Sequence, residues 1–98
     1  MRKITEKAVE AFLSNNSFNG NNTKVSKVIG GTRMYLHNNC IAENINGRIG
    51  ITNCGWFTNT TKERLNGIPG VSIRQVNGNW ILNGNLWDGA WIEIDNAN

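Results

Sequence analysis

The stretch RMYLHNNCIAENINGRIGITNC, residues 33–54, contains three short β-prone runs separated by two asparagine-rich pairs. The pairs are Asn38-Asn39 and Asn46-Gly47, and both residue types accept the positive φ angles of two-residue hairpin turns. Runs rich in Ile, Tyr and Met between such turns are typical of short strands. The stretch therefore predicts an antiparallel meander of three strands.

The flanking segments extend this pattern in both directions. Residues 3–14, KITEKAVEAFLS, place apolar side chains at helical spacing, which predicts an amphipathic helix ended by Asn15-Asn16. Residues 23–29 alternate and predict a half-buried strand. Asn77-Gly78 predicts a second hairpin between VSIRQV and NWIL, and residues 90–94 predict a last strand.

A second, shorter helix is expected at residues 60–66, TTKERLN. Thr60 followed by Glu63 three residues later has the pattern of a capping box, and Gly67 is a suitable stop. Leu65 would pack inward, while Lys62 and Arg64 would form an outer, charged face. Reversing both charges to Glu is expected to spare the fold.

Together these elements predict an α+β fold in one domain, residues 1–98. An N-terminal helix and a short middle helix would pack on an antiparallel sheet of five to six strands. Only the chain ends, residues 1–2 and 95–98, are expected to fray.

Charge is unevenly distributed along the chain. The formal net charge is +3, residues 24–74 carry seven Lys or Arg against two Glu, and residues 75–98 carry three acidic residues and no Lys or Arg. Such asymmetry can steer a partner electrostatically, although a solvated surface is the plain alternative. No apolar run is long enough to cross a membrane, and no signal peptide is evident.

A thiol enzyme is one possible reading of the meander. A two-residue turn at Asn38-Asn39 would place His37 opposite Cys40, and the next turn would place Cys40 opposite Asn53, which are the residue types of a Cys-His-Asn protease. A mid-sheet Cys lacks the helix N-terminus that activates thiolates, so core packing is the favoured interpretation. In this register Cys54 points to the opposite face from Cys40, which disfavours a disulfide. Two Cys and one His match no zinc spacing, so neither metal nor cofactor is expected.

Four tryptophans are the largest apolar side chains of this small chain. Three of the four are expected in the core, and Trp87, in the turn LWDGAW, is expected to be partly exposed. Exposed Trp with neighbouring polar residues is a usual anchor of protein interfaces. The predicted partner-binding residues are Thr58, Lys62, Arg64, Trp87 and Asp88.

Several segments resemble a group of small proteins of bacteriophages and prophages. They include KITEKAVEAF, MYLHNNCIA, ITNCGWFTNTTKERLNGI and GVSIRQVNGNWILNG, and the most specific is the Gly55-Trp56 pattern running to TTKERLN. Where other members have Gly after the first Asn of the YLHN turn, this chain has Asn39. The resemblance implies a setting, the cytoplasm of an infected bacterium, and carries over no catalytic residue.

The leading hypothesis is therefore a non-enzymatic phage protein that binds and inhibits a host or defence protein complex, for example as an anti-CRISPR. The alternative is a small basic module that binds nucleic acid, with salt-sensitive phosphate contacts. The residues of that alternative site are Arg33, Arg48, Lys62, Arg64 and Arg74.

Overall fold

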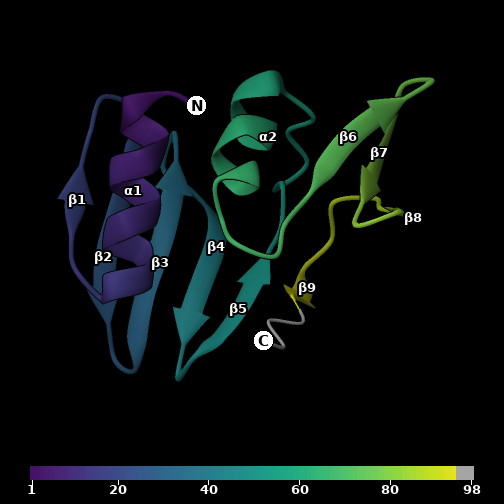
Figure 1. Cartoon of the computed structure of the whole chain (residues 1–98). Coiled ribbons are helices and arrows are strands. Elements are labelled where there is room, and N and C mark those ends of the chain that lie inside the picture. The colour runs from purple at the N-terminus through teal and green to yellow at the C-terminus, as the bar shows by residue number, and fades with distance from the viewer. Residues whose placement is uncertain (95–98) are drawn as a thin grey trace.

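The computed structural model describes residues 1–94 of the chain; residues 95–98, expected to fray, lie outside the described part. Two helices and nine strands are found within residues 1–94 (Figure 1). Their order is α1 (Lys3–Ser14), β1 (Phe18–Asn19), β2 (Thr23–Val28), β3 (Gly31–Leu36), β4 (Asn39–Ile45), β5 (Arg48–Ile51), α2 (Asn59–Asn66), β6 (Ile73–Val76), β7 (Asn79–Leu82), β8 (Asn85–Leu86) and β9 (Ile92–Ile94).

The described strands form two antiparallel sheets. The larger has six strands in the order β1-β2-β3-β4-β5-β9, and the smaller has three in the order β6-β7-β8. The predicted α+β class is therefore confirmed, with its N-terminal helix, its short middle helix and its central meander. The hairpin at Asn77-Gly78 also forms, but it belongs to the separate small sheet on the far side of α2 from α1 (Figure 1).

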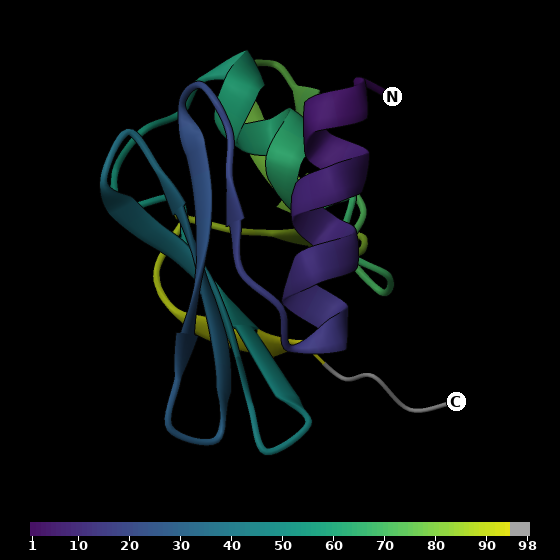
Figure 2. The same cartoon turned by 90° about the vertical axis from the view of Figure 1, so that its left-hand side faces the viewer.

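Both helices lie on the same face of the six-stranded sheet (Figure 2). Strand β3 shows the resulting alternation, because Thr32, Met34 and Leu36 are buried toward the helices whereas Arg33 is exposed. Two side chains of the sheet also hold the last turn of α1, since Thr32 Oγ1 and Asn44 Nδ2 donate hydrogen bonds to the carbonyl oxygen of Phe12. These bonds satisfy a helix-end carbonyl that has no intrahelical partner.

The first hairpin of the meander differs from its predicted register. His37 and Asn38, rather than Asn38-Asn39, occupy the turn with φ angles of 50° and 67°, and Leu36 pairs with Asn39. A bulge between Met34 and Tyr35 then shifts the pairing by one residue, so that Met34 pairs with Ala42, whereas the predicted turn would have paired Tyr35 with Ala42. The bulge keeps Met34 and Ala42 together in the core, which pairing without this shift would have prevented. The second predicted turn, Asn46-Gly47, is confirmed.

The helix α2 begins at Asn59, one residue earlier than predicted, and its cap lies two residues before the predicted cap, Thr60. Its N-cap is Thr58, whose Oγ1 accepts a hydrogen bond of 3.2 Å from the Thr61 backbone N–H and lies 2.9 Å from Thr61 Oγ1. Glu63 does not reach back to cap the helix, because its carboxylate accepts hydrogen bonds from Thr5 of α1 and from the backbone N–H of Arg2, just before α1. Gly67 ends the helix, and there a Cβ atom would lie 2.7 Å from Thr5 Cγ2. Glycine is therefore required for α1 and α2 to approach each other closely.

The predicted exposure of Arg64 is wrong, because its side chain is only 1% exposed. Its Nε donates to Thr23 Oγ1 and its Nη1 to Thr5 Oγ1, each at 2.8 Å, and Nη2 donates to Asn22 Oδ1 at 3.2 Å. Nη1 also pairs with the carboxylate of Glu63, which accepts a further hydrogen bond from Thr5. One guanidinium thus joins α1, α2 and the start of β2.

The N-cap can be tested by alanine substitution. Thr58→Ala is expected to lower the free energy of unfolding by about 1 kcal/mol, because it removes the acceptor for the Thr61 amide. Thr60→Ala is the matched control and is expected to change it by less than about 0.5 kcal/mol. Urea unfolding measures both, and a larger loss for Thr60→Ala would contradict the assignment of Thr58.

Charge reversal distinguishes the two cationic residues of α2. Arg64→Glu is expected to cost about 3–5 kcal/mol, since it buries a second carboxylate beside Glu63 and removes the partner of three polar groups. Lys62→Glu is the control and should cost less than about 1 kcal/mol, because its ammonium group is near the surface. Thermal unfolding with circular dichroism compares the variants, and similar melting temperatures would disprove the role assigned to Arg64.

The Arg64 network also predicts a pH dependence. Partial burial alone would raise the pKa of Glu63, but hydrogen bonds from Thr5 and the Arg2 backbone, with the charge of Arg64, outweigh it and hold the pKa below the ordinary 4.5. A carboxylate with a lowered pKa stabilises the fold above its unfolded-state pKa, and this contribution disappears as the pH falls through the folded-state pKa. The free energy of unfolding should therefore fall on acidification below pH 4.5.

Glu63→Gln should lose this part of the acid sensitivity, whereas the exposed Glu10→Gln should behave like the parent. Urea titrations at a series of pH values measure the slope. If the parent and Glu63→Gln show the same slope, the carboxylate of Glu63 does not contribute as described.

Candidate protein-binding surface

The loop from residue 53 to residue 58 connects β5 to α2 and begins with a tight turn. The side-chain oxygen of Asn53 accepts a hydrogen bond of 2.8 Å from the Gly55 amide, and its carbonyl oxygen accepts one of 2.8 Å from the Trp56 amide. Cys54 and Gly55 have φ angles of 54° and 83°, which reverse the chain direction. The turn therefore fixes the position of the backbone at the next two residues, Trp56 and Phe57.

The turn is attached to a second segment of the chain at Gly89. Asn53 N–H and Thr52 Oγ1 both donate to the carbonyl oxygen of Gly89, at 3.1 and 2.6 Å. A Cβ atom at Gly89 would lie 2.2 Å from Asn53 Oδ1, and Gly89 has a φ of 90°. Only glycine fits both requirements, so Gly89 locks the loop against the segment that follows β8.

This loop presents two adjacent aromatic side chains to solvent. Trp56 is 57% exposed and Phe57 is 54% exposed, and Leu86 of β8 is 74% exposed. The Phe57 ring meets the buried Trp80 edge to face, with centroids 5.1 Å apart, and Trp80 in turn contacts Trp87 at 6.2 Å. Phe57 therefore rests on a buried aromatic pair, Trp80 and Trp87. We call Trp56, Phe57 and Leu86 the aromatic surface.

Two hollows flank the aromatic surface. The first, about 290 Å³, lies beneath Trp56, with Leu36 and Ile41 among its apolar residues and His37, Asn39, Thr58, Thr60 and Thr61 as its polar ones. The second, about 690 Å³ and more open, is lined by Phe57, Gly78, Asn79, Trp80, Leu86, Trp87 and Asp88. A smaller apolar cavity with a polar rim suits one side chain of a partner.

Of the predicted partner-binding residues, three lie at or beside these hollows and two are buried. Thr58 lines the first hollow, and the exposed Asp88 lines the second. Lys62 lies beside them, with its Nζ 5.7 Å from the Trp80 ring centroid and 3.0 Å from Gln75 Oε1. Trp87 is 7% exposed and donates its indole N–H to Ala90 O, so the predicted exposure was wrong and its role is to support the surface. Arg64, being buried, is excluded from direct contact.

The tryptophans show what the sequence pattern missed. Trp80 and Trp87 are buried, whereas Trp56 and Trp91 are exposed, so two rather than three lie in the core. The turn residues Asn53-Cys54-Gly55 immediately before Trp56 were the available signal, since side chains directly after a surface turn are often exposed. The prediction used the turn at Asp88-Gly89 instead, where Trp87 folds back inside.

The basic residues proposed for nucleic-acid binding do not gather at one place. Arg33 and Arg48 lie on the face of the six-stranded sheet that the helices leave uncovered, whereas Arg74 lies in the three-stranded sheet. Lys62 is on α2, and Arg64 is buried beneath it. A continuous track for a phosphate backbone is therefore not formed by this set.

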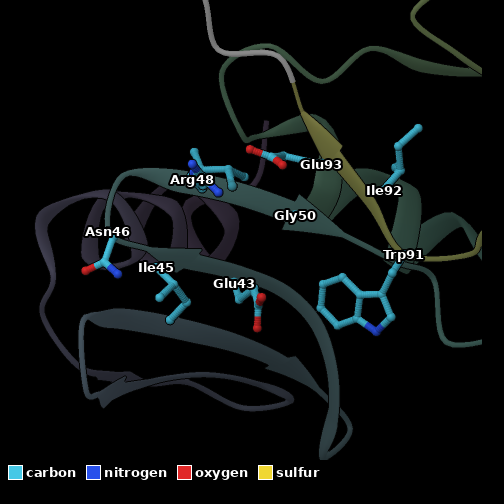
Figure 3. A pocket seen from close by; sticks show the side chains of 9 residues that line it. Glu43, Ile45, Asn46, Arg48, Gly50, Trp91, Ile92 and Glu93 are labelled. Carbon is cyan, nitrogen blue, oxygen red and sulfur yellow. The ribbon is translucent and has the colours of Figure 1, made fainter.

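The uncovered sheet face contains a third, open hollow of about 750 Å³ (Figure 3). The ring of Trp91 lies over Gly50, where a Cβ atom would be 3.5 Å away. Glu43, Arg48 and Glu93 surround it, and Glu43 pairs with Arg33 at 3.5 Å. Mixed charges of this kind are ordinary for the solvated side of an antiparallel sheet, so this hollow is a weaker candidate than the aromatic surface.

The predicted trio of His37, Cys40 and Asn53 is not assembled as expected. His37 is in the turn, and Tyr35 takes its place opposite Cys40. Burial raises the pKa of the Cys40 thiol, which is the opposite of the change that activates a nucleophilic cysteine. Asn53 is buried and holds the loop turn. The strand pairing thus does not place the three side chains next to one another as predicted.

Comparison with known proteins adds the biological setting. A search of curated proteins and a search of solved structures found no match. Among residues 1–94, no helix is both long and apolar enough to cross a membrane. A family model described as "Kyanoviridae Gp96 protein" matches residues 1–96, nearly the whole chain. The protein therefore belongs to the Kyanoviridae Gp96 family, a family of phage proteins.

Proposed function

We propose that this phage protein binds a protein of the infected cell through the aromatic surface and inhibits that partner by covering part of it. The partner would belong to a host complex or to a defence complex such as a CRISPR effector, and the site of action would be the bacterial cytoplasm. Membership in a phage family supports the setting. No catalytic step is proposed.

The observation that carries the proposal is the exposure of Trp56 and Phe57 on a rigid support. Large exposed aromatic side chains that follow one another in a loop are uncommon on protein surfaces, and such side chains are enriched among the residues that dominate binding energy. Trp56 is held by the Asn53 turn, and Phe57 by its contact with Trp80. Binding would therefore require little additional ordering of the loop, which favours affinity.

The hollow beneath Trp56 indicates what the partner contributes. Its apolar residues, Leu36 and Ile41, would contact an aliphatic or aromatic side chain, while the hydroxyl group of Thr60 can bond to the partner backbone around it. On the other side of Phe57, Asp88 is exposed and lies in a part of the chain without Lys or Arg, residues 75–98. The partner surface should thus combine an apolar anchor with a basic residue facing Asp88.

Affinity purification from infected cells tests the proposal. The tagged parent is expected to retain a specific protein, and the double variant Trp56→Ala, Phe57→Ala should reduce the affinity at least about 100-fold, because both anchors are lost. Trp91→Ala is the matched control: Trp91 is as exposed as Trp56 but lies on the uncovered sheet face. It should bind like the parent.

The same purification distinguishes the proposed function from the alternative, nucleic-acid binding. If the retained material is lost after nuclease treatment, and binding weakens steeply with salt, the protein binds nucleic acid and the proposal fails. It also fails if the Trp91 variant loses binding while the Trp56, Phe57 variant, with an unchanged circular dichroism spectrum, retains it. Inhibition itself is tested by adding the purified protein to the isolated partner.

A further inference from the structure

The two cysteines of the chain meet at the base of the loop that carries the aromatic surface. Cys54 Sγ lies 2.9 Å from the carbonyl oxygen of Cys40, although the residues are 14 positions apart. Both are free thiols; Cys40 is partly buried at the start of β4, and Cys54 is exposed. The expectation that strand alternation would separate them does not apply, because β5 ends at Ile51 and Cys54 lies in the turn.

The contact limits the distance that a disulfide bond would have to close. A carbonyl oxygen is about 2.4 Å from its own Cα, so Cys54 Sγ is no more than about 5.3 Å from Cys40 Cα. The Sγ of Cys54 is about 2.8 Å from its own Cα, so the two Cα atoms are at most about 8.1 Å apart, and a disulfide requires them to be about 4.4–6.8 Å apart. Rotation of both thiols with a small movement of the turn brings the sulfurs together.

We propose that Cys40 and Cys54 form a reversible disulfide that fixes the loop 53–58 to β4 and so regulates the aromatic surface. The effect on partner binding rests on the proposed function, whereas formation of the bond does not. In the reduced protein the loop has no covalent link to β4 and is held by hydrogen bonds and by the packing of Phe57 on Trp80. In the oxidised protein it is covalently anchored two residues before Trp56.

The oxidant is a low-molecular-weight disulfide such as oxidised glutathione. The thiolate of the exposed Cys54 attacks one sulfur of glutathione disulfide and releases one glutathione thiolate. Cys40 then attacks the sulfur of Cys54, the mixed disulfide breaks, and a second glutathione leaves. The protein loses two electrons and two protons, and glutathione disulfide becomes two glutathione molecules. Glutathione in its reduced form reverses both steps.

The thiols are tuned to react slowly at neutral pH. Burial raises the pKa of Cys40 above its ordinary 9.0, more than a hydrogen bond with the Ala42 backbone and the charge of Arg33 lower it, and burial likewise raises the pKa of Cys54. Since the thiolate is the attacking species, the rate of closure should rise as the pH increases toward these values. The disulfide is thus expected to form under sustained oxidation rather than at the ordinary, reducing redox potential of a cytoplasm.

The experiment begins with the isolated protein incubated with oxidised glutathione. Closure is expected to lower the mass by about 2 Da, to raise the melting temperature by about 5–10 °C, and to slow amide hydrogen exchange at residues 53–58. Dithiothreitol should reverse all three changes. Cys40→Ser and Cys54→Ser are the controls; each should take up one glutathione at most and show no rise in melting temperature.

Several outcomes would overturn the inference. They are stable addition of glutathione at both cysteines, cross-linked dimers in place of the mass loss, and closure without a change in exchange at residues 53–58. Partner affinity is measured last and should rise at least about 3-fold in the oxidised form, because the covalent link removes the motion that the noncovalent contacts leave in the loop. If closure occurs but no protein partner is retained in either form, the disulfide stands and the proposed function fails.

Discussion

The buried guanidinium of Arg64 is the interaction on which the two helices and the sheet depend together. A charged group inside a protein is tolerated only when its hydrogen-bonding positions are satisfied and its charge is balanced. Arg64 meets this requirement through Thr5, Thr23, Asn22 and Glu63, which come from three different parts of the chain. Because no partner can move without leaving a buried donor unpaired, the network sets the position of α2, and with it the loop that precedes α2.

The candidate surface is rigid because the loop that carries it is attached to α2, whose position the Arg64 network sets. At one end of the loop, the Thr58 cap joins it to α2; at the other, Asn53 and Thr52 bind the Gly89 carbonyl. Between these two anchors Trp56 and Phe57 have few ways to turn inward, and Phe57 rests on Trp80. The exposure of two aromatic side chains is thus imposed by the fold and is not a consequence of a loose loop. This is the physical basis for assigning a binding role to them.

Asparagine explains much of how so small a chain makes these connections. In the hairpin turns it adopts positive φ, as at Asn46, Asn77 and Asn83. Elsewhere the side-chain amide of an asparagine bonds to backbone groups of another segment. The Asn66 side chain bonds to both the N–H and the carbonyl of Ile73, which joins α2 to β6. Asn83 similarly bonds to Ser72 and Gly70. The high asparagine content therefore has a structural use at these positions.

The sequence by itself determined the local elements: the amphipathic α1, the strands on either side of Asn46-Gly47 and Asn77-Gly78, and the α+β class. These follow from side-chain periodicity and backbone preference, which act over a few residues. Other features were decided only by the tertiary structure. They include the burial of Arg64, which depends on Thr5 and Thr23 from distant segments, and the exposure of Trp56 instead of Trp87. The contact of Cys54 with Cys40 was also decided only by the tertiary structure, and so was the bulge that accompanies the turn at His37-Asn38. In each of these cases the conformational preference of one residue competes with the packing of the whole core. A periodic sequence pattern contains no information about which distant side chains will be available as partners.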